Sequence, residues 1–113
     1  MMEASVRGVA PNDRRSEVLD VLHSLKGPTE VTIGCRACRI MQDADNLAVL
    51  TYQVRWDTRE ELDDHFRSER FRRLLPYIDM SVEAPEVEVI LVERIGGIEF
   101  LVSALGPETR PSA

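Results

Sequence analysis

A pair of strand-like segments with a helical pattern on either side constrains the fold of this chain most. Residues 30–42 alternate apolar and polar side chains, and residues 47–56 are rich in β-branched and aromatic ones. The four residues between them, Asp-Ala-Asp-Asn, are typical of a turn, so the two segments predict a β-hairpin. Helices before and after a hairpin have to pack against the sheet that contains it, which leaves few α+β topologies.

The first helical pattern covers residues 14–26. Three apolar residues recur at i, i+4 and i+7 and share one face of this helix: Val18, Leu22 and Leu25. A Pro-Asn-Asp sequence before the pattern predicts a turn and a cap, and Gly27-Pro28 after it predicts its end. A short segment before the helix, residues 4–9, is the candidate first strand.

The second helical pattern covers residues 57–78. Thr58 and Glu61 have the spacing of a capping box, and acidic residues early with basic residues late suit the helix dipole. The apolar side chains change phase along this segment, between a first group of Leu62 and Phe66 and a second group of Phe71, Leu74, Leu75 and Ile78. We therefore expect a break near residues 67–69, and we expect Pro76 to end the second piece.

The C-terminal part of the chain contains one more clear strand. Residues 86–95 are strongly strand-like, and the Gly-Gly pair that follows them predicts a turn. Residues 98–105 are expected to add an optional further strand, and residues 106–113 a frayed tail. A chain of 113 residues is the size of one domain, which we expect to span residues 1–105.

The resulting order is β-α-β-β-α-β, the split βαβ layout of the ferredoxin-like α+β fold. Its sheet is antiparallel, and both helices lie on one face. The last strand carries apolar side chains on both of its sides, Val87, Val89 and Leu91 on one and Ile90 and Val92 on the other. A sheet that is apolar on both faces needs a second cover, so we expect a homodimer.

Charge and hydropathy exclude two classes of partner. The net charge of −6 disfavours attraction to nucleic acid and to anionic membranes. The N-terminal segment lacks the apolar core of a signal peptide, and no apolar run approaches the roughly 20 residues that a membrane span needs. We therefore expect a cytoplasmic protein whose partners include neither nucleic acid nor a membrane.

Two longer segments carry a family resemblance. The segments GPTEVTIGCRACRIMQD and VLTYQVRWDTREELDDHFRSERFRRLLPYIDM, followed by a hydrophobic strand, resemble the antibiotic biosynthesis monooxygenase family. Its members are small dimeric α+β-barrel proteins that include quinol monooxygenases and anthrone oxidases. The resemblance covers roughly residues 14–95. Its most specific part is a strand ending in Trp56, then a helix carrying His65, then RSERFRRLL.

The resemblance implies a function and a mechanism. Enzymes of this family oxidise electron-rich phenols with O₂ in a pocket between the helices and the sheet. They need neither metal nor flavin, because the deprotonated substrate itself passes an electron to oxygen. Such a site needs an apolar pocket, a group that helps the phenol lose its proton, and a donor for the developing oxyanion. The expected partners are therefore a second copy of the chain and a small aromatic or quinol-type molecule, with no cofactor and no metal.

The candidate site residues follow from the same family resemblance. His65 is the candidate catalytic residue, as base or donor, because an unperturbed imidazole pKa of about 6.5 suits proton transfer near neutrality. Tyr52 and Trp56 share one side of their strand, four residues apart. The predicted substrate-binding residues are Trp56, Tyr52, Phe66 and Leu62.

The chain departs from two branches of that family. Anthrone oxidases have an Asn where this chain has Tyr52 and a Tyr where it has Leu62, so their polar set for substrate binding is not reproduced. The haem-degrading branch uses an Asn on the first strand, a Trp on the second helix and a His near that helix's end. At the first place this chain has Arg7 and Gly8, at the second His65, and near the third Leu75. This set does not fit haem degradation.

Both cysteines of the chain, Cys35 and Cys38, stand in a C-x-x-C spacing. In a regular strand, residues three apart point to opposite faces, so the two sulfur atoms are expected to diverge. A structural zinc site needs four ligands, and two cysteines with two scattered histidines do not supply it. We expect Cys35 to be a small buried hydrophobe. A β-bulge that realigns the two thiols, or a redox role, stays open.

The leading function is cofactor-independent oxygenation of a small aromatic or quinol-type substrate. The alternative is a non-catalytic dimeric module that binds a small apolar ligand. A third option is a thiol-dependent activity through Cys35. The first hypothesis predicts a pocket at which His65 meets Tyr52 or Trp56, and the second predicts an apolar pocket without convergent polar groups.

Overall fold

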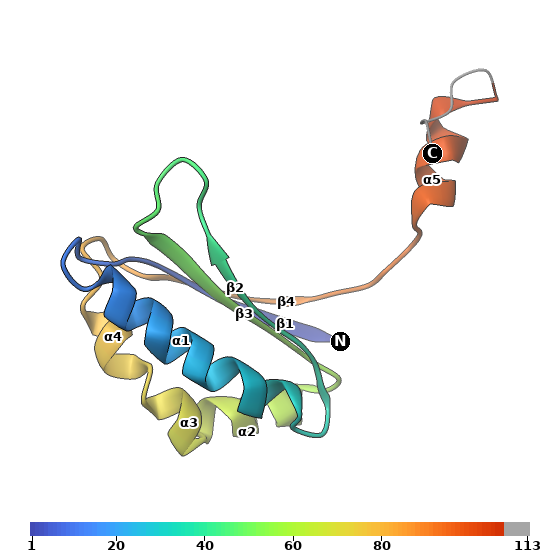
Figure 1. Ribbon diagram of the computed structural model, residues 1–113. Helices are drawn as coiled ribbons and strands as arrows, with labels where there is room; N and C mark the ends of the chain where they lie inside the picture. Colours follow the sequence, from blue (N-terminus) through green and yellow to red (C-terminus); the bar gives the residue numbers. More distant parts are fainter. Residues whose placement is uncertain (108–113) are drawn as a thin grey trace.

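A four-stranded antiparallel sheet with helices on one face forms the body of the protein (Figure 1). The computed structural model describes residues 1–107. The strand order is β2-β3-β1-β4, which is the ferredoxin-like arrangement that the sequence predicts. The strands are β1 (Met2–Val9), β2 (Cys35–Gln42), β3 (Val49–Trp56) and β4 (Glu86–Leu91).

The core lies between the sheet and the helices. Alternate residues of β3 face the helices and are at most 5% exposed: Leu50, Tyr52, Val54 and Trp56. The predicted apolar face of the first helix, α1, packs against them through Val18, Leu22 and Leu25. The period-2 pattern of β3 and the i, i+4, i+7 pattern of α1 thus meet in one hydrophobic core.

Helix α1 (Arg15–Glu30) continues past the Gly27-Pro28 pair that was expected to end it. Pro28 lacks an N–H, but the last turn is held in other ways. The Val31 N–H donates to the Gly27 carbonyl at 3.3 Å, and Thr29 is completely buried. Burial of this turn against the body outweighs the local preference to stop, as tertiary contacts often do.

The longer helix delays the next strand. Residues 31–34 form a turn, so β2 begins at Cys35 and not at residue 30. Gly34 has φ +91°, a left-handed conformation that favours glycine, and a Cβ there would also have to displace the Glu61 carboxylate, 1.4 Å away. The Gly34 carbonyl accepts a hydrogen bond of 2.9 Å from the Asp57 N–H, which ties the turn to the end of β3.

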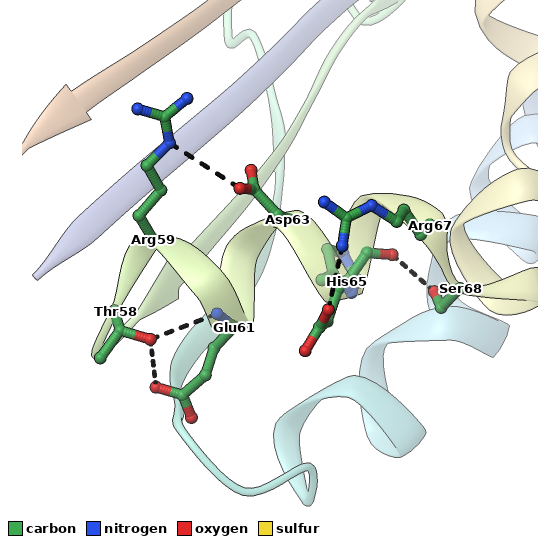
Figure 2. Close-up of polar contacts among 8 residues, drawn as sticks. Thr58, Arg59, Glu61, Asp63, His65, Arg67 and Ser68 are labelled. Atoms are coloured by element: carbon green, nitrogen blue, oxygen red, sulfur yellow. Dashed lines mark hydrogen bonds and ion pairs between the residues drawn. The ribbon is translucent and has the colours of Figure 1, made fainter.

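The second helical segment is broken, as the change of apolar phase predicts. It forms α2 (Arg59–Arg67), α3 (Glu69–Arg72) and α4 (Leu75–Asp79). Thr58 caps α2: its Oγ accepts from the Glu61 N–H at 3.2 Å and donates to the Glu61 carboxylate at 2.9 Å (Figure 2). The expectation that Pro76 ends a helix is wrong, because Pro76 lies in the first turn of α4, where a missing N–H leaves no bond unmade.

The C-terminal segment differs most from its prediction. β4 ends at Leu91, and residues 98–105 form a helix, α5 (Ile98–Leu105), where a further strand was expected. A strand needs a neighbour for its backbone groups, whereas a helix satisfies them within itself. The Gly97 N–H donates to the Glu99 carboxylate at 2.9 Å at its start. Most of the expected frayed tail, residues 108–113, lies outside the described residues. The domain boundary at residue 105 stays a prediction.

The sheet face opposite the helices is more polar than expected. It carries the ion pair of Glu3 with Arg55, 2.8 Å long, and that of Arg7 with Glu86, 3.8 Å long. The apolar strip of β4 made by Val87, Val89 and Leu91 lies on the helix side instead, where no helix covers it, and is 48–79% exposed. None of the described helices has the length and apolarity needed to cross a bilayer.

Candidate functional site

Three of the predicted site residues meet between α2 and β3. Tyr52 and Trp56 stand on the helix-facing side of β3, and His65 stands on the buried side of α2. All three are buried, with exposed fractions of 3%, 1% and 4%. The Tyr52 hydroxyl and His65 Nε2 lie 3.2 Å apart, within hydrogen-bond distance. The alternation of β3 and the face of α2 therefore bring these side chains together as predicted.

The imidazole of His65 is enclosed by aromatic rings. Its ring centroid lies 5.1 Å from that of Trp56, 5.4 Å from Phe71 and 6.2 Å from Tyr52. Phe66 packs on the outer side, with a centroid distance of 6.1 Å. A ring held on so many sides keeps one orientation, which favours a defined role for its two nitrogens.

Burial sets the charge of this cluster. Burial first, and the nearby Arg70 cation second, lower the pKa of His65 to about 4. Burial also raises the pKa of the Tyr52 phenol well above its usual value. Both groups are therefore neutral near pH 7. The ordinary imidazole pKa of 6.5 assumed from sequence does not hold here, because a charged ring would have to be desolvated.

Two cavities border this aromatic cluster, the first at Tyr52 and the second at Trp56 and His65. The first, of about 40 Å³, is reached by Tyr52 and walled by apolar side chains of β1, α1 and α4. It has room for a water-sized molecule only. The second, of about 140 Å³, is lined by Trp56, His65, Thr32, Ile33, Glu61, Asp64, Ser68 and Arg70. A cavity of about 150 Å³ can hold a benzene ring, so the second cavity suits one small aromatic ring.

The second cavity offers polar groups beside its aromatic walls. The buried Trp56 Nε1–H has no acceptor among the described residues, which is uncommon for a buried donor. Arg70 donates to the Thr32 hydroxyl at 3.2 Å, and this contact joins α3 to the turn before β2. Ser68 caps α3 and donates to the His65 carbonyl at 2.6 Å (Figure 2). The cavity wall thus includes the neutral imidazole of His65 and the guanidinium of Arg70 beside the carboxylates of Glu61 and Asp64.

Two predicted substrate-binding residues have supporting positions. Leu62 is 2% exposed and belongs to the core, and Phe66 is half-buried against it. Neither lines the second cavity. Sequence reasoning missed Arg70, although it falls in the RSERFRRLL segment, because the break at Ser68 decides which arginine turns inward. It also missed Ile33, because the turn before β2 was read as strand.

A β-bulge between Cys35 and Ala37 realigns the cysteines. Cys38 is buried at 4% exposure and Cys35 is half-buried, and both pack on the core side of the sheet. The expectation that their sulfurs diverge is therefore wrong, and the bulge that was left open explains why. Burial raises the pKa of both thiols, which keeps them protonated and weakens a thiol-dependent activity. Among the residues that the structure describes, no cluster of ligand side chains could hold a metal ion.

Comparison with known families agrees with this geometry. Residues 2–76 match the sequence model of the family described as antibiotic biosynthesis monooxygenase. The chain belongs to this family. The matched region contains β1, α1, β2, β3 and the helices that carry His65 and Arg70, so every residue of the second cavity lies inside it.

Solved structures support the fold. Rv0793 from Mycobacterium tuberculosis superposes with a TM-score of 0.75 at 22% identity, covering 84% of this chain and 98% of that one. A protein described as an antibiotic biosynthesis monooxygenase gives 0.74 at 20% identity, covering 83% and 100%. A conserved protein from Methanosarcina mazei gives 0.72 at 21% identity, covering 79% and 89%. At these identities the likeness concerns the fold. A comparison with curated proteins gives no significant match.

Proposed function

We propose that this protein is a cofactor-independent monooxygenase that oxidises a small phenol or quinol-type molecule with O₂. The observation that carries the proposal is the cavity of about 140 Å³ beside His65 and Trp56. It has the volume of one aromatic ring, and its lining includes the imidazole of His65, the indole of Trp56 and the guanidinium of Arg70. These are the groups that deprotonation of a phenol and stabilisation of an oxyanion require.

His65 accepts the proton of the substrate hydroxyl in this proposal. Tyr52 engages Nε2, which leaves Nδ1 as the ring nitrogen available to a substrate. A pKa of about 4 makes the ring a weak base in the empty site. Proton transfer creates a phenolate beside the imidazolium, and this ion pair offsets the desolvation that lowers the pKa. The guanidinium of Arg70 on the cavity wall attracts the phenolate, whereas the carboxylates of Glu61 and Asp64 on the same wall oppose it.

Oxygen then reacts with the activated ring. The phenolate passes one electron to O₂, which gives a phenoxyl radical and superoxide. The two combine at a ring carbon that carries a hydrogen, and the resulting peroxide anion takes the proton back from the imidazolium to become a hydroperoxide. Loss of water from it leaves a carbonyl at that carbon. One oxygen atom thus enters the product and the other leaves as water. The free N–H of Trp56 is a donor for the developing negative charge on oxygen.

The alternative of a non-catalytic module that binds an apolar ligand receives less support. The cavity with the apolar walls measures only about 40 Å³, too small for an organic ligand. The larger cavity has convergent polar groups, which that alternative does not require.

Oxygen uptake tests the proposal. Metal-free protein is given a panel of hydroquinones and other single-ring phenols, and the oxygen uptake that depends on protein is measured. We expect His65→Ala to lower kcat/KM about 100-fold or more, since general bases contribute about 10²–10⁴-fold. Trp56→Phe keeps the ring but removes the N–H, and is expected to lower kcat about tenfold or more.

His23→Ala is the matched control, because His23 is the chain's other histidine and is exposed on α1. It should leave uptake unchanged. Uptake that survives His65→Ala in a folded variant would contradict the site, and absence of uptake across the panel with folded protein would favour the binding module.

A further inference from the structure

The wall of the cavity beside His65 carries charges of both signs. Arg70 supplies a guanidinium, and Glu61 and Asp64 supply carboxylates. Asp64 pairs with Arg67 at 3.2 Å. Among the described residues, neither Glu61 nor Arg70 takes part in an ion pair. Two opposite charges that line one cavity without meeting are both satisfied by a ligand that is negative at one end and positive at the other.

The cavity also has a buried side and an exposed side. His65 and Trp56 are 4% and 1% exposed, and the half-buried Arg70 lies close enough to His65 to help lower its pKa. Asp64 and Ile33 are exposed and form the mouth. The hydroxyl of a phenol bound beside the imidazole therefore lies near the guanidinium, and the opposite end of the ring points toward the mouth.

The carboxylate of Glu61 is held in place from two sides. The Thr58 hydroxyl donates to its Oε1 at 2.9 Å (Figure 2). Its Oε2 occupies the space that a side chain at Gly34 would fill. The guanidinium of Arg36, on β2, is engaged by Asp57. A carboxylate that is already ordered loses little further side-chain freedom when a cation binds to it, which favours binding.

An ammonium group matches this carboxylate better than other groups do. A neutral hydroxyl donates a hydrogen bond but leaves the negative charge uncompensated, and a hydrogen bond between two charged groups is about twice as strong as one between neutral groups. A carboxylate on the ligand would be repelled. Among the described residues, no cluster of ligand side chains could hold a metal ion there. An aliphatic amine has a pKa of about 10 and is therefore positively charged near pH 7.

We propose that the substrate of this cavity is a single-ring phenol or quinol that carries a protonated amino group on a short aliphatic arm. Its ring fills the volume of about 140 Å³, its hydroxyl lies beside His65 and Arg70, and its ammonium group lies at the mouth between Glu61 and Asp64. The arm is short because the ring alone fills the cavity. The ammonium group also offsets the repulsion between these carboxylates and a phenolate. The word substrate rests on the proposed function, but the binding preference does not.

Binding of three matched probes tests the proposal without turnover. Para-hydroxybenzylamine, para-hydroxybenzyl alcohol and para-hydroxybenzoate share a phenol ring and carry a positive, a neutral and a negative substituent. Each is titrated into ¹⁵N-labelled protein at pH 7, and the indole N–H signal of Trp56, the one tryptophan of the chain, reports binding. We expect the amine to bind about tenfold more tightly than the alcohol, and the carboxylate to bind more weakly than either.

Glu61→Gln tests the residue that selects the amine. Glutamine also serves at this position of a capping box, so the variant should keep the start of α2. We expect it to reduce the preference for the amine over the alcohol to about threefold or less. Glu60→Gln is the matched control, because Glu60 is the exposed neighbour on the same helix and does not line the cavity. It should leave the preference unchanged.

Three results would overturn the proposal: equal affinities of wild type for the amine and the alcohol, a preference that survives Glu61→Gln, or a Trp56 signal that no probe changes. Its failure is distinguishable from failure of the proposed function. Oxygen uptake with neutral quinols and no preference for the amine would keep the function and reject this inference. Selective binding of the amine without oxygen uptake would support the inference and reject the function.

Discussion

The buried environment of His65 changes the acid–base behaviour of its imidazole. Its position on α2 was predictable from sequence, and so was its meeting with Tyr52 and Trp56, because helix and strand periodicities fix which side chains face the core. Its pKa of about 4 was not predictable, because it depends on how deeply the ring is buried among aromatic side chains and on Arg70 across the break at Ser68. The same burial makes the residue sensitive to acid.

The depressed pKa of His65 predicts a loss of stability in acid. The unfolded chain binds a proton at this ring below about pH 6.5, whereas the folded chain resists until about pH 4, so stability falls as the pH drops through this window. Between pH 7.5 and pH 4.5 the free energy of unfolding should fall by roughly 2–3 kcal/mol less in His65→Gln than in wild type, as measured by urea unfolding. His23→Gln should behave as wild type. An equal loss in His65→Gln would show that His65 titrates normally.

At the level of elements, the break between α2 and α3 sets the shape of the site. Ser68 has φ −65° and ψ 148°, and its hydroxyl accepts from the Phe71 N–H while donating to the His65 carbonyl. The phase change of apolar residues predicted this break. Other boundaries were not predictable. Helix α1 runs through Pro28 because Thr29 is buried, and α5 is helical because no strand lies beside it.

Ser68→Ala should therefore destabilise the protein by about 1–2 kcal/mol, the usual effect of removing a helix cap. Because the cap also fixes the His65 carbonyl, substrate turnover should fall as well. Ser24→Ala is the matched control, since its exposed hydroxyl bonds only the Val21 carbonyl within α1. Chemical denaturation measures both variants, and equal stability of the two would show that Ser68 does not hold the junction.

For the whole molecule, the surface available to the expected homodimer differs between sequence and structure. The sequence suggested a sheet with two apolar faces, whereas the open face carries ion pairs such as Glu3 with Arg55, and the uncovered apolar surface lies on α5, β4 and the turn at Ile33. Strand parity was correctly predicted for β3 and β4, but not for β2, where the bulge between Cys35 and Ala37 changes it. The sequence could not predict that the helices fail to cover the helix-facing side of β4, because this depends on how far the helix layer extends across the sheet.

A dimer paired through charges should respond to salt. We expect the dissociation constant of a homodimer paired through the open sheet face to rise several-fold between 50 and 500 mM NaCl, because salt screens exposed charges of that face such as Arg39 and Glu88. Sedimentation at several salt concentrations measures this dependence. A dimer that tightens with salt would show that apolar contacts alone hold it.

The central claim is that the cavity beside His65 is where oxygen enters a phenolic ring. Its most direct test uses ¹⁸O₂ with the best substrate of the panel and compares wild type with His65→Ala. The account predicts one labelled atom in each product molecule, one in water, and loss of protein-dependent labelling in the variant. Label incorporated equally by a folded His65→Ala variant, or product oxygen that comes from water, would contradict it.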